Sequence, residues 1–157
     1  MKRIIAVLLV AALGTGCGLR ETEKPKEKVT ATPARDYVSE GVLRLQQGDP
    51  VAAVRNFDEA IKQNPLDPRP YVLLAQTYMY TKDYHRAIDT LMAATRVAPN
   101  DGEVYYLLAV NYNLIKETGR AKASAQKSVE IYGQMRDEEN FLKSVALLQG
   151  LMKPEAE

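Results

Sequence analysis

The chain has 157 residues, of which 46% are hydrophobic and 26% charged, with 21 Lys and Arg against 20 Asp and Glu. These proportions are typical of a soluble globular protein of about one domain, and they argue against a disordered chain or a multi-pass membrane protein. A net charge of +1 predicts no basic surface for nucleic acid. With one Cys and one His, we expect no internal disulfide, no metal site and no cofactor.

The first sixteen residues have the composition of an export signal. Lys2 and Arg3 precede an apolar run over 4–13 that is followed by small residues. This run is shorter than the roughly 20 residues of a membrane-spanning helix. We therefore predict a signal peptide over 1–16, and Gly14 and Gly16 also suit cleavage as an ordinary secretory signal.

Cys17 directly after such a run resembles the bacterial lipoprotein signal, although Gly14 stands where that signal usually has Leu. The resemblance implies that Cys17 becomes the first mature residue and carries acyl chains such as palmitate. Gly18 in place of Asp resembles lipoproteins that are sent on to the outer membrane. The expected location is thus the bacterial envelope, on the periplasmic face of the outer membrane more than on the inner membrane.

Residues 17–33 are expected to form a lipidated Cys and a flexible tether. The segment mixes both charges, lacks apolar periodicity and contains Pro25 and Pro33. A flexible tether of this length has a root-mean-square reach of about 20–24 Å. It would hold a folded domain clear of the lipid headgroups.

The remaining sequence repeats itself with a period of 34 residues and without gaps. Aromatic, small and apolar side chains recur in the same order, which indicates an array of similar units. The coinciding residues are Tyr37, Tyr71 and Tyr105; Gly41, Ala75 and Ala109; Ala53, Ala87 and Ala121; Phe57, Leu91 and Ala125; Ala60, Ala94 and Ser128; and Pro65 and Pro99.

Each unit is predicted to form two helices. In the first unit, apolar residues at helical spacing favour a helix over 34–46, and Gly48 ends it. Asp49 and Pro50 are suited to start a second helix, which Asn64 and Pro65 would end. Small residues at the coinciding positions allow the two helices to pack at 8–10 Å.

A unit with this period and this order of residues resembles the tetratricopeptide repeat. The resemblance implies an all-α, right-handed superhelical solenoid of three helix–turn–helix units with a C-terminal capping helix. The third unit departs from the pattern at Thr118, Ala125 and Ser128, so its second helix is expected to pack more loosely. The predicted segments are units over 34–67, 68–101 and 102–135, a capping helix over 136–152 and a tail over 153–157.

In the capping helix, Phe141, Val145, Leu148 and Met152 are expected to form the apolar stripe. A terminal repeat cannot bury its outer face alone, which is why such a helix is needed.

The resemblance also implies a concave groove lined by the first helix of each unit. In this groove Val72, Met79, Tyr80 and Tyr106 are expected to form one apolar strip that binds a partner protein, as a peptide or helix. The alternative is that some of these side chains belong to the core. The implied groove residues are Arg35, Val38, Val42, Leu45, Arg69, Val72, Gln76, Met79, Tyr80, Glu103, Tyr106, Val110 and Asn113.

One use of such repeats, the clamp for the C-terminal carboxylate of cytosolic chaperones, is excluded. That clamp needs Lys, Asn and Arg donors. The matching positions hold Val38, Val42, Leu73, Glu103 and Leu107.

No catalytic residues are expected, because His85 has no partner at helical spacing and Cys17 lies in the signal region. The favoured function is a non-catalytic adaptor or scaffold that is lipid-anchored in the envelope. The alternatives are a pilotin or assembly factor of a pilus, secretion system or envelope complex, and, less favoured, an accessory subunit of an enzyme.

Overall fold

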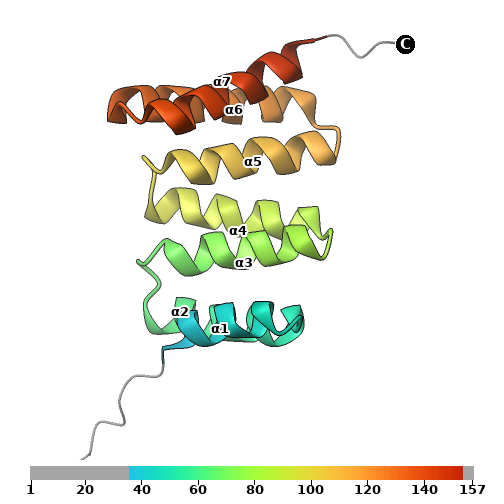
Figure 1. The fold of residues 1–157 in the computed structure, drawn as a ribbon, viewed down its shortest axis with the longest axis vertical. Coiled ribbons are helices and arrows are strands. Elements are labelled where there is room, and N and C mark those ends of the chain that lie inside the picture. The colour runs from blue at the N-terminus through green and yellow to red at the C-terminus, as the bar shows by residue number, and fades with distance from the viewer. Residues whose placement is uncertain (1–35, 154–157) are drawn as a thin grey trace, which may run out of the picture. The chain divides into compact units, whose positions relative to one another are not determined.

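Seven α-helices and no strand make up residues 36–153, the part of the chain that this computed structural model describes (Figure 1). The chain divides into two units, 1–33 and 34–157, and all described residues belong to the second. The predicted signal peptide, Cys17 and the tether lie outside the described residues. The helices are α1 (Tyr37–Gln46), α2 (Pro50–Gln63), α3 (Arg69–Tyr80), α4 (Tyr84–Val97), α5 (Gly102–Leu114), α6 (Thr118–Met135) and α7 (Glu138–Met152).

Aspartates determine where most of the helices begin. Each accepts a backbone N–H of the first turn, which has no partner inside the helix. These aspartates are Asp36, Asp49, Asp83, Asp101 and Asp137. Helix α1 therefore begins at Tyr37 and not at residue 34, because Asp36 is its N-cap.

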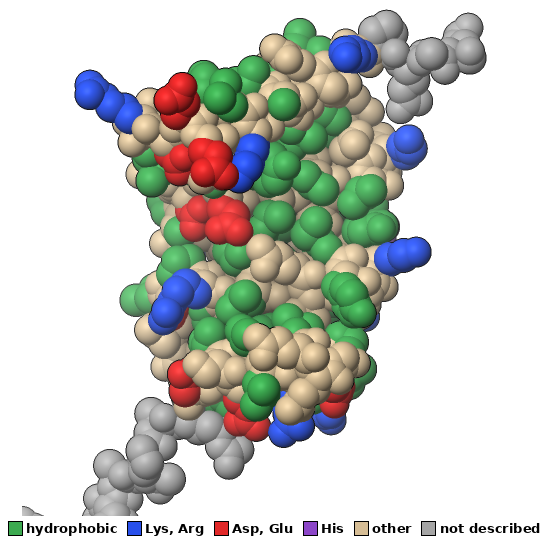
Figure 2. Space-filling model, viewed as in Figure 1, with side chains coloured by type: hydrophobic (Ala, Val, Ile, Leu, Met, Phe, Trp, Pro, Cys, Tyr) green, Lys and Arg blue, Asp and Glu red, His purple; other side chains and the backbone are tan. Residues whose placement is uncertain are grey.

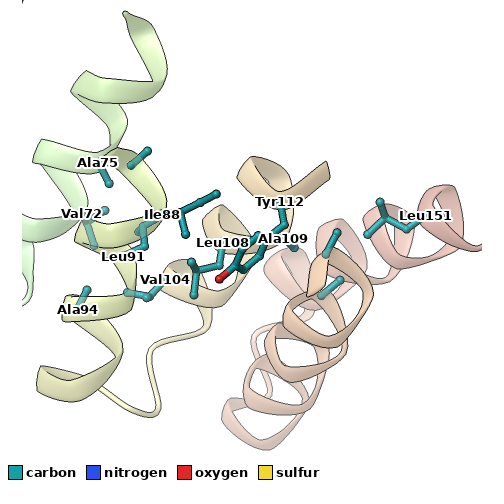
Figure 3. Packing of buried hydrophobic residues seen from close by; sticks show 13 residues of the cluster. Val72, Ala75, Ile88, Leu91, Ala94, Val104, Leu108, Ala109, Tyr112 and Leu151 are labelled. Atoms are coloured by element: carbon teal, nitrogen blue, oxygen red, sulfur yellow. The ribbon is translucent and has the colours of Figure 1, made fainter. Parts of the chain in front are cut away.

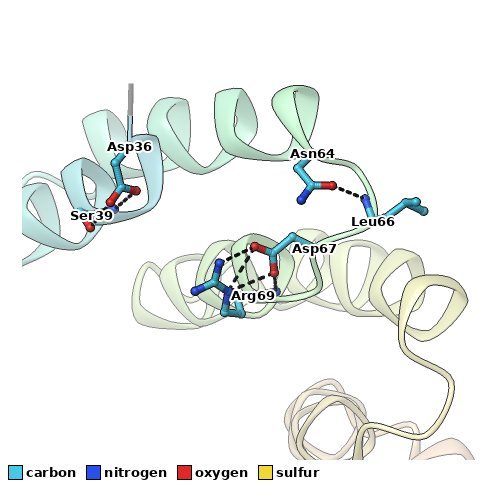
Figure 4. A network of polar contacts seen from close by, with 6 residues as sticks. All are labelled: Asp36, Ser39, Asn64, Leu66, Asp67 and Arg69. Atoms are coloured by element: carbon cyan, nitrogen blue, oxygen red, sulfur yellow. Dashed lines mark hydrogen bonds and ion pairs between the residues drawn. The ribbon is translucent and has the colours of Figure 1, made fainter. Parts of the chain in front are cut away.

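Helix α3 begins differently from the other helices (Figure 4). Pro68 is its N-cap residue, and Asp67, one residue earlier, accepts the backbone N–H of Arg69 at 3.0 Å. The Arg69 guanidinium also donates to both Asp67 carboxylate oxygens at 2.7–3.1 Å. Asp67 thus fixes the start of α3 and the position of the Arg69 side chain.

Small residues at the recurring positions let the paired helices approach closely. Ala53, Ala75, Ala87, Ala109 and Ala121 have no exposed surface. In the first unit, a Cβ added to Gly41 would lie 2.5 Å from the Phe57 ring. The small residues that recur every 34 residues are therefore the positions at which paired helices contact each other.

The core continues from one unit to the next (Figure 3). Leu91 of α4 and Val104 of α5 are fully buried in a cluster that runs from α3 to α7. Phe57 forms a second cluster with Ala53 and with Leu74 of the following unit. Since buried side chains join neighbouring units, the array is one continuous stack.

In each unit, the turn between the two helices contains one residue with a left-handed backbone conformation at the same position. Gly48 has φ 76°, and Lys82 and Lys116 at the corresponding places have φ 60° and 65°. Gly adopts this left-handed backbone conformation readily, and residues other than Gly, Asn and Asp rarely adopt it.

The third unit corrects the expectation of looser packing. Ala125 and Ser128 have no exposed surface. The Ser128 hydroxyl lies 2.9 Å from the Gly102 carbonyl oxygen and 2.8 Å from the Ser144 hydroxyl of α7. Ser128 therefore replaces the usual Ala because it joins α5, α6 and α7 through buried hydrogen bonds.

We expect Ser128→Ala to lower the free energy of unfolding by about 1 kcal/mol, because it removes a buried hydrogen bond to Gly102. Ser144→Ala should cost less, since Ser144 otherwise donates to its own helix at the Asn140 carbonyl, 2.8 Å away. Urea denaturation of both variants and of the double variant measures these values. A Ser128→Ala protein more stable than the parent would contradict the role of this bond.

Helix α7 has the character of the first helix of a fourth unit. Its buried residues are Ser144 and Leu151, and Leu148 packs against the core. The predicted stripe is wrong at Met152, whose surface is 64% exposed. The stripe is displaced because Ser144 and Leu151 face α6.

Candidate partner-binding surface

Two hollows lie between successive first helices, on the side of α3, α5 and α7 that we call the first-helix face, together with the corresponding side of α1. The hollow between α3 and α5 has a volume of about 290 Å³, and that between α5 and α7 about 300 Å³. Glu103 borders both. The first is lined by Pro68, Arg69, Val72, Leu73, Gln76, Asp101 and Glu103, and the second by Glu103, Tyr106, Leu107, Tyr132, Asn140 and Lys143.

Glu103 is the central polar group of this face. Its carboxylate accepts a hydrogen bond from the Gln76 side chain at 3.3 Å, which links α3 to α5. Partial burial raises the pKa of the Glu103 carboxyl, and the negative charge of Asp101 raises it further. The site therefore disfavours additional negative charge.

Tyr132 of α6 forms part of the wall beside Glu103. Burial raises the pKa of the Tyr132 phenol to about 12, with contributions from the charges of Glu103, Asp101 and Asp137. Tyr132 consequently stays neutral, and its ring packs against Gly102, where an added Cβ would lie 2.7 Å away.

The basic side chains that line the two hollows are engaged in ion pairs. Arg69 pairs with Asp67 at 2.7 Å, and Lys143 pairs with Glu139 at 2.6 Å. The hydrogen bond from Arg69 lowers the pKa of the Asp67 carboxyl. Exposed pairs of this kind contribute little to stability. Their effect is to hold the charged groups at the border of the face.

A family model described as the tetratricopeptide repeat matches residues 44–110. The chain therefore contains tetratricopeptide repeats in this matched segment. No curated protein matches its sequence.

Several solved structures have the same repeat fold. The PcrH protein of Pseudomonas aeruginosa is 14% identical, with a TM-score of 0.70 over 74% of this chain and 89% of that chain. The TPR2B domain of yeast Sti1, in a complex with pHsp70, is 21% identical, with a TM-score of 0.69 over 73% and 92%. The Yersinia enterocolitica type III secretion chaperone SycD, in complex with a peptide of the translocator YopD, is 15% identical, with a TM-score of 0.68 over 73% and 88%.

The groove residues expected on α1 lie beside the core of the first tetratricopeptide unit. Val42 and Leu45 are partly buried against the cluster that contains Phe57. Val38 is also partly buried, and Arg35 lies outside the described residues. This end of the face is less open than the sequence suggests.

On α3 the structure separates the residues of the expected apolar strip. Val72 lines the hollow between α3 and α5, but it is only 8% exposed and belongs to the core, so the structure corrects its expected place in an exposed strip. Its side chain is covered because α4 and α5 pack on that side of α3. Met79 is partly buried against the same core, whereas Tyr80 is 73% exposed and Gln76 is also exposed.

On α5 the expected residues lie at three different places. Tyr106 is half-buried in the wall of the second hollow. Val110 is partly buried. Asn113 is exposed and lines a separate hollow of about 350 Å³ near the end of α7.

Sequence reasoning missed the contribution of α7 to this face. Asn140 and Lys143 line the second hollow, but the 34-residue comparison gives them no counterparts. A shift of 36 residues would have found them: it places Asp137, Glu139 and Phe141 on Asp101, Glu103 and Tyr105. The difference of two arises because α6, with 18 residues, is four residues longer than α4, while the connection from α6 to α7 over 136–137 is two residues shorter than that over 98–101.

Within residues 36–153 there is no group of three His, Cys, Asp or Glu side chains placed to hold a metal ion. In the same range, no helix has the length and apolar content needed to cross a membrane. His85 is exposed on α4.

Proposed function

We propose that the protein is a non-catalytic adaptor that binds a segment of a partner protein on its first-helix face. The observation that carries this proposal is the row of hollows between α3, α5 and α7, with Tyr80 and Tyr106 available at the surface. Tyrosines of this kind are favoured at protein interfaces. The peptide complex of SycD supports the proposal through its similar fold.

The bound segment is not held by its C-terminal carboxylate. The positions that would carry the donors of a carboxylate clamp hold Val38, Val42, Leu73, Glu103 and Leu107. Glu103 lies at the border of both hollows and would repel a carboxylate. The partner is therefore recognised by internal side chains.

Photocrosslinking tests where the partner binds. A benzoylphenylalanine in place of Tyr80 should crosslink a discrete protein in envelope preparations. The same group in place of Leu66, which is 78% exposed in the loop before α3, should not. Equal products from both positions would show that the first-helix face has no special role.

We further propose that Cys17 carries the lipid that anchors this adaptor to the bacterial envelope, with 17–33 as the tether. The support is the order of charged, apolar and small residues before Cys17. An envelope-anchored repeat array would serve as a scaffold, or as a pilotin or assembly factor of a pilus, secretion system or envelope complex.

We expect Cys17→Ser to move the protein from the membrane pellet to the soluble periplasmic fraction, or to leave it unprocessed at a larger size. A single substitution is sufficient because acylation needs the thiol. Fractionation followed by immunoblotting measures this. A variant of mature size that still sediments with membranes would refute the anchor.

A further inference from the structure

The first helices all run in the same direction, so the first-helix face has two chemically different edges. Each first helix is joined to an antiparallel second helix by a short turn (Figure 1). The beginnings of α3, α5 and α7 therefore lie along one edge and their ends along the opposite edge.

The edge at the beginnings of α5 and α7 is negatively charged, and we call it the acidic edge. It contains Asp101, Glu103, Asp137 and Glu138. Arg136 lies on the same edge, and Lys143 there is neutralised by its pair with Glu139. Burial is the main cause of the raised pKa values of Glu103 and Tyr132, and the neighbouring carboxylates raise both further.

The edge at the ends of α3, α5 and α7 is positively charged, and we call it the basic edge. Lys82 and Lys153 follow α3 and α7, and Lys122 of α6 lies beside Asn113 at the end of α5. Arg86 and Arg120 nearby are paired with Asp83 and Glu117, so those residues add no net charge. A hollow of about 350 Å³ at this edge is lined by Asn113, Thr118, Lys122, Gly150, Leu151, Met152 and Lys153, with no carboxylate among them.

Figure 2 shows this separation over the part of the molecule that contains α5 and α7. Acidic side chains gather on one side, and the charged side chains on the opposite side are basic. Helix dipoles do not reverse the pattern. Each first helix lies beside a second helix of opposite direction, so their terminal half-charges largely cancel.

We propose that the partner segment is an amphipathic helix with an apolar stripe between one basic and one acidic flank. This inference rests on the proposed function. The apolar stripe contacts Tyr80, Tyr106 and Val110, the basic flank faces the acidic edge, and the acidic flank faces the basic edge.

The dimensions favour a helix over an extended strand. Helix α5 has 13 residues, so the two edges are separated by about 20 Å. A helix of about 10–12 Å diameter with long charged side chains spans that width. A strand lying flat points its side chains alternately into the face and away from it, so it cannot reach both edges while burying an apolar stripe.

The charge separation also determines the direction of the bound helix. A helix whose apolar stripe faces the surface can exchange its two flanks only by turning end for end. A partner with a given order of flanks therefore binds in one direction along the stack from α1 to α7.

Three synthetic 18-residue peptides that share the same apolar stripe and differ only in their flanks test this inference. The first has Lys on one flank and Glu on the other, the second has the flanks exchanged, and the third has Gln on both. Each carries a nitroxide at its N-terminus, and binding is followed by NMR on the ¹⁵N-labelled full chain with Cys17→Ser. The charged peptides should bind about tenfold more tightly than the Gln peptide in 50 mM salt, and this difference should disappear in 500 mM salt.

The nitroxide should broaden amide signals of α1 with one charged peptide and of α7 with the other. The double variant Glu103→Gln with Lys82→Gly should reduce the tenfold advantage, and Lys82→Gly suits the left-handed φ of 60° at that position. Equal affinity of the Gln peptide, or one direction for both charged peptides, would overturn this inference and leave the proposed binding face intact. If no peptide binds, this inference fails, and photocrosslinking at Tyr80 decides the proposed function separately.

Discussion

Ala87→Leu should lower the free energy of unfolding by about 1–3 kcal/mol. Ala87 has no exposed surface and belongs to the core cluster that also contains Val72 and Ala75 of α3. The three additional carbon atoms of Leu have no space there, so the two helices must separate or the side chain must adopt a strained rotamer. Urea or thermal denaturation followed by circular dichroism measures the loss.

Two control variants distinguish the loss of stability caused by overpacking at Ala87 from the effect of a substitution at an exposed position. Ala123→Leu makes the same substitution at an exposed position of α6 and should change stability by less than about 0.5 kcal/mol. His85→Ala removes an exposed side chain two residues before Ala87 and should also be nearly neutral. Equal melting temperatures for Ala87→Leu and His85→Ala would contradict the close packing assigned to the repeat.

The repeat was readable from the sequence because close packing restricts residue size. Positions such as Gly41, Ala75 and Ala109 admit only small side chains, since each lies against the second helix of its own unit. Aspartates before the helices were readable for a similar reason, because few side chains can accept the free N–H groups of a first turn. Both signals are local and recur every 34 residues.

Contacts between elements far apart in the sequence were not readable. Ser128 was interpreted as a departure that loosens the third unit, because its hydrogen-bond partner Ser144 lies on α7, outside the three repeats. Val72 was expected in an exposed strip because the family resemblance places it on the groove side of its helix, but the packing of α4 and α5 on α3 buries most of it. The candidate surface therefore required the three-dimensional arrangement, while the array itself did not.

Tyr80→Ser together with Tyr106→Ser should weaken partner binding at least thirtyfold. Tyr80 is 73% exposed and Tyr106 lines the hollow between α5 and α7, so both are free to bury ring area against a partner. Truncating an interface anchor of this type often costs 2 kcal/mol or more, which corresponds to about thirtyfold in affinity. Met79 is left unchanged because it packs against the core, and its loss would confuse binding with folding.

The matched control is Val51→Ser with Leu66→Ser. These apolar side chains are 65% and 78% exposed; they lie on α2 and in the loop between α2 and α3, and neither lines the two hollows. Both double variants should keep the helical circular dichroism of the parent, because none of the four side chains is buried. The crosslinked partner, or the amphipathic peptide with the tightest binding, should be lost with the tyrosine variant and retained with the control. Retention by both would place the binding surface on the second helices or on the outer side of α7, since these are the remaining exposed surfaces of the array.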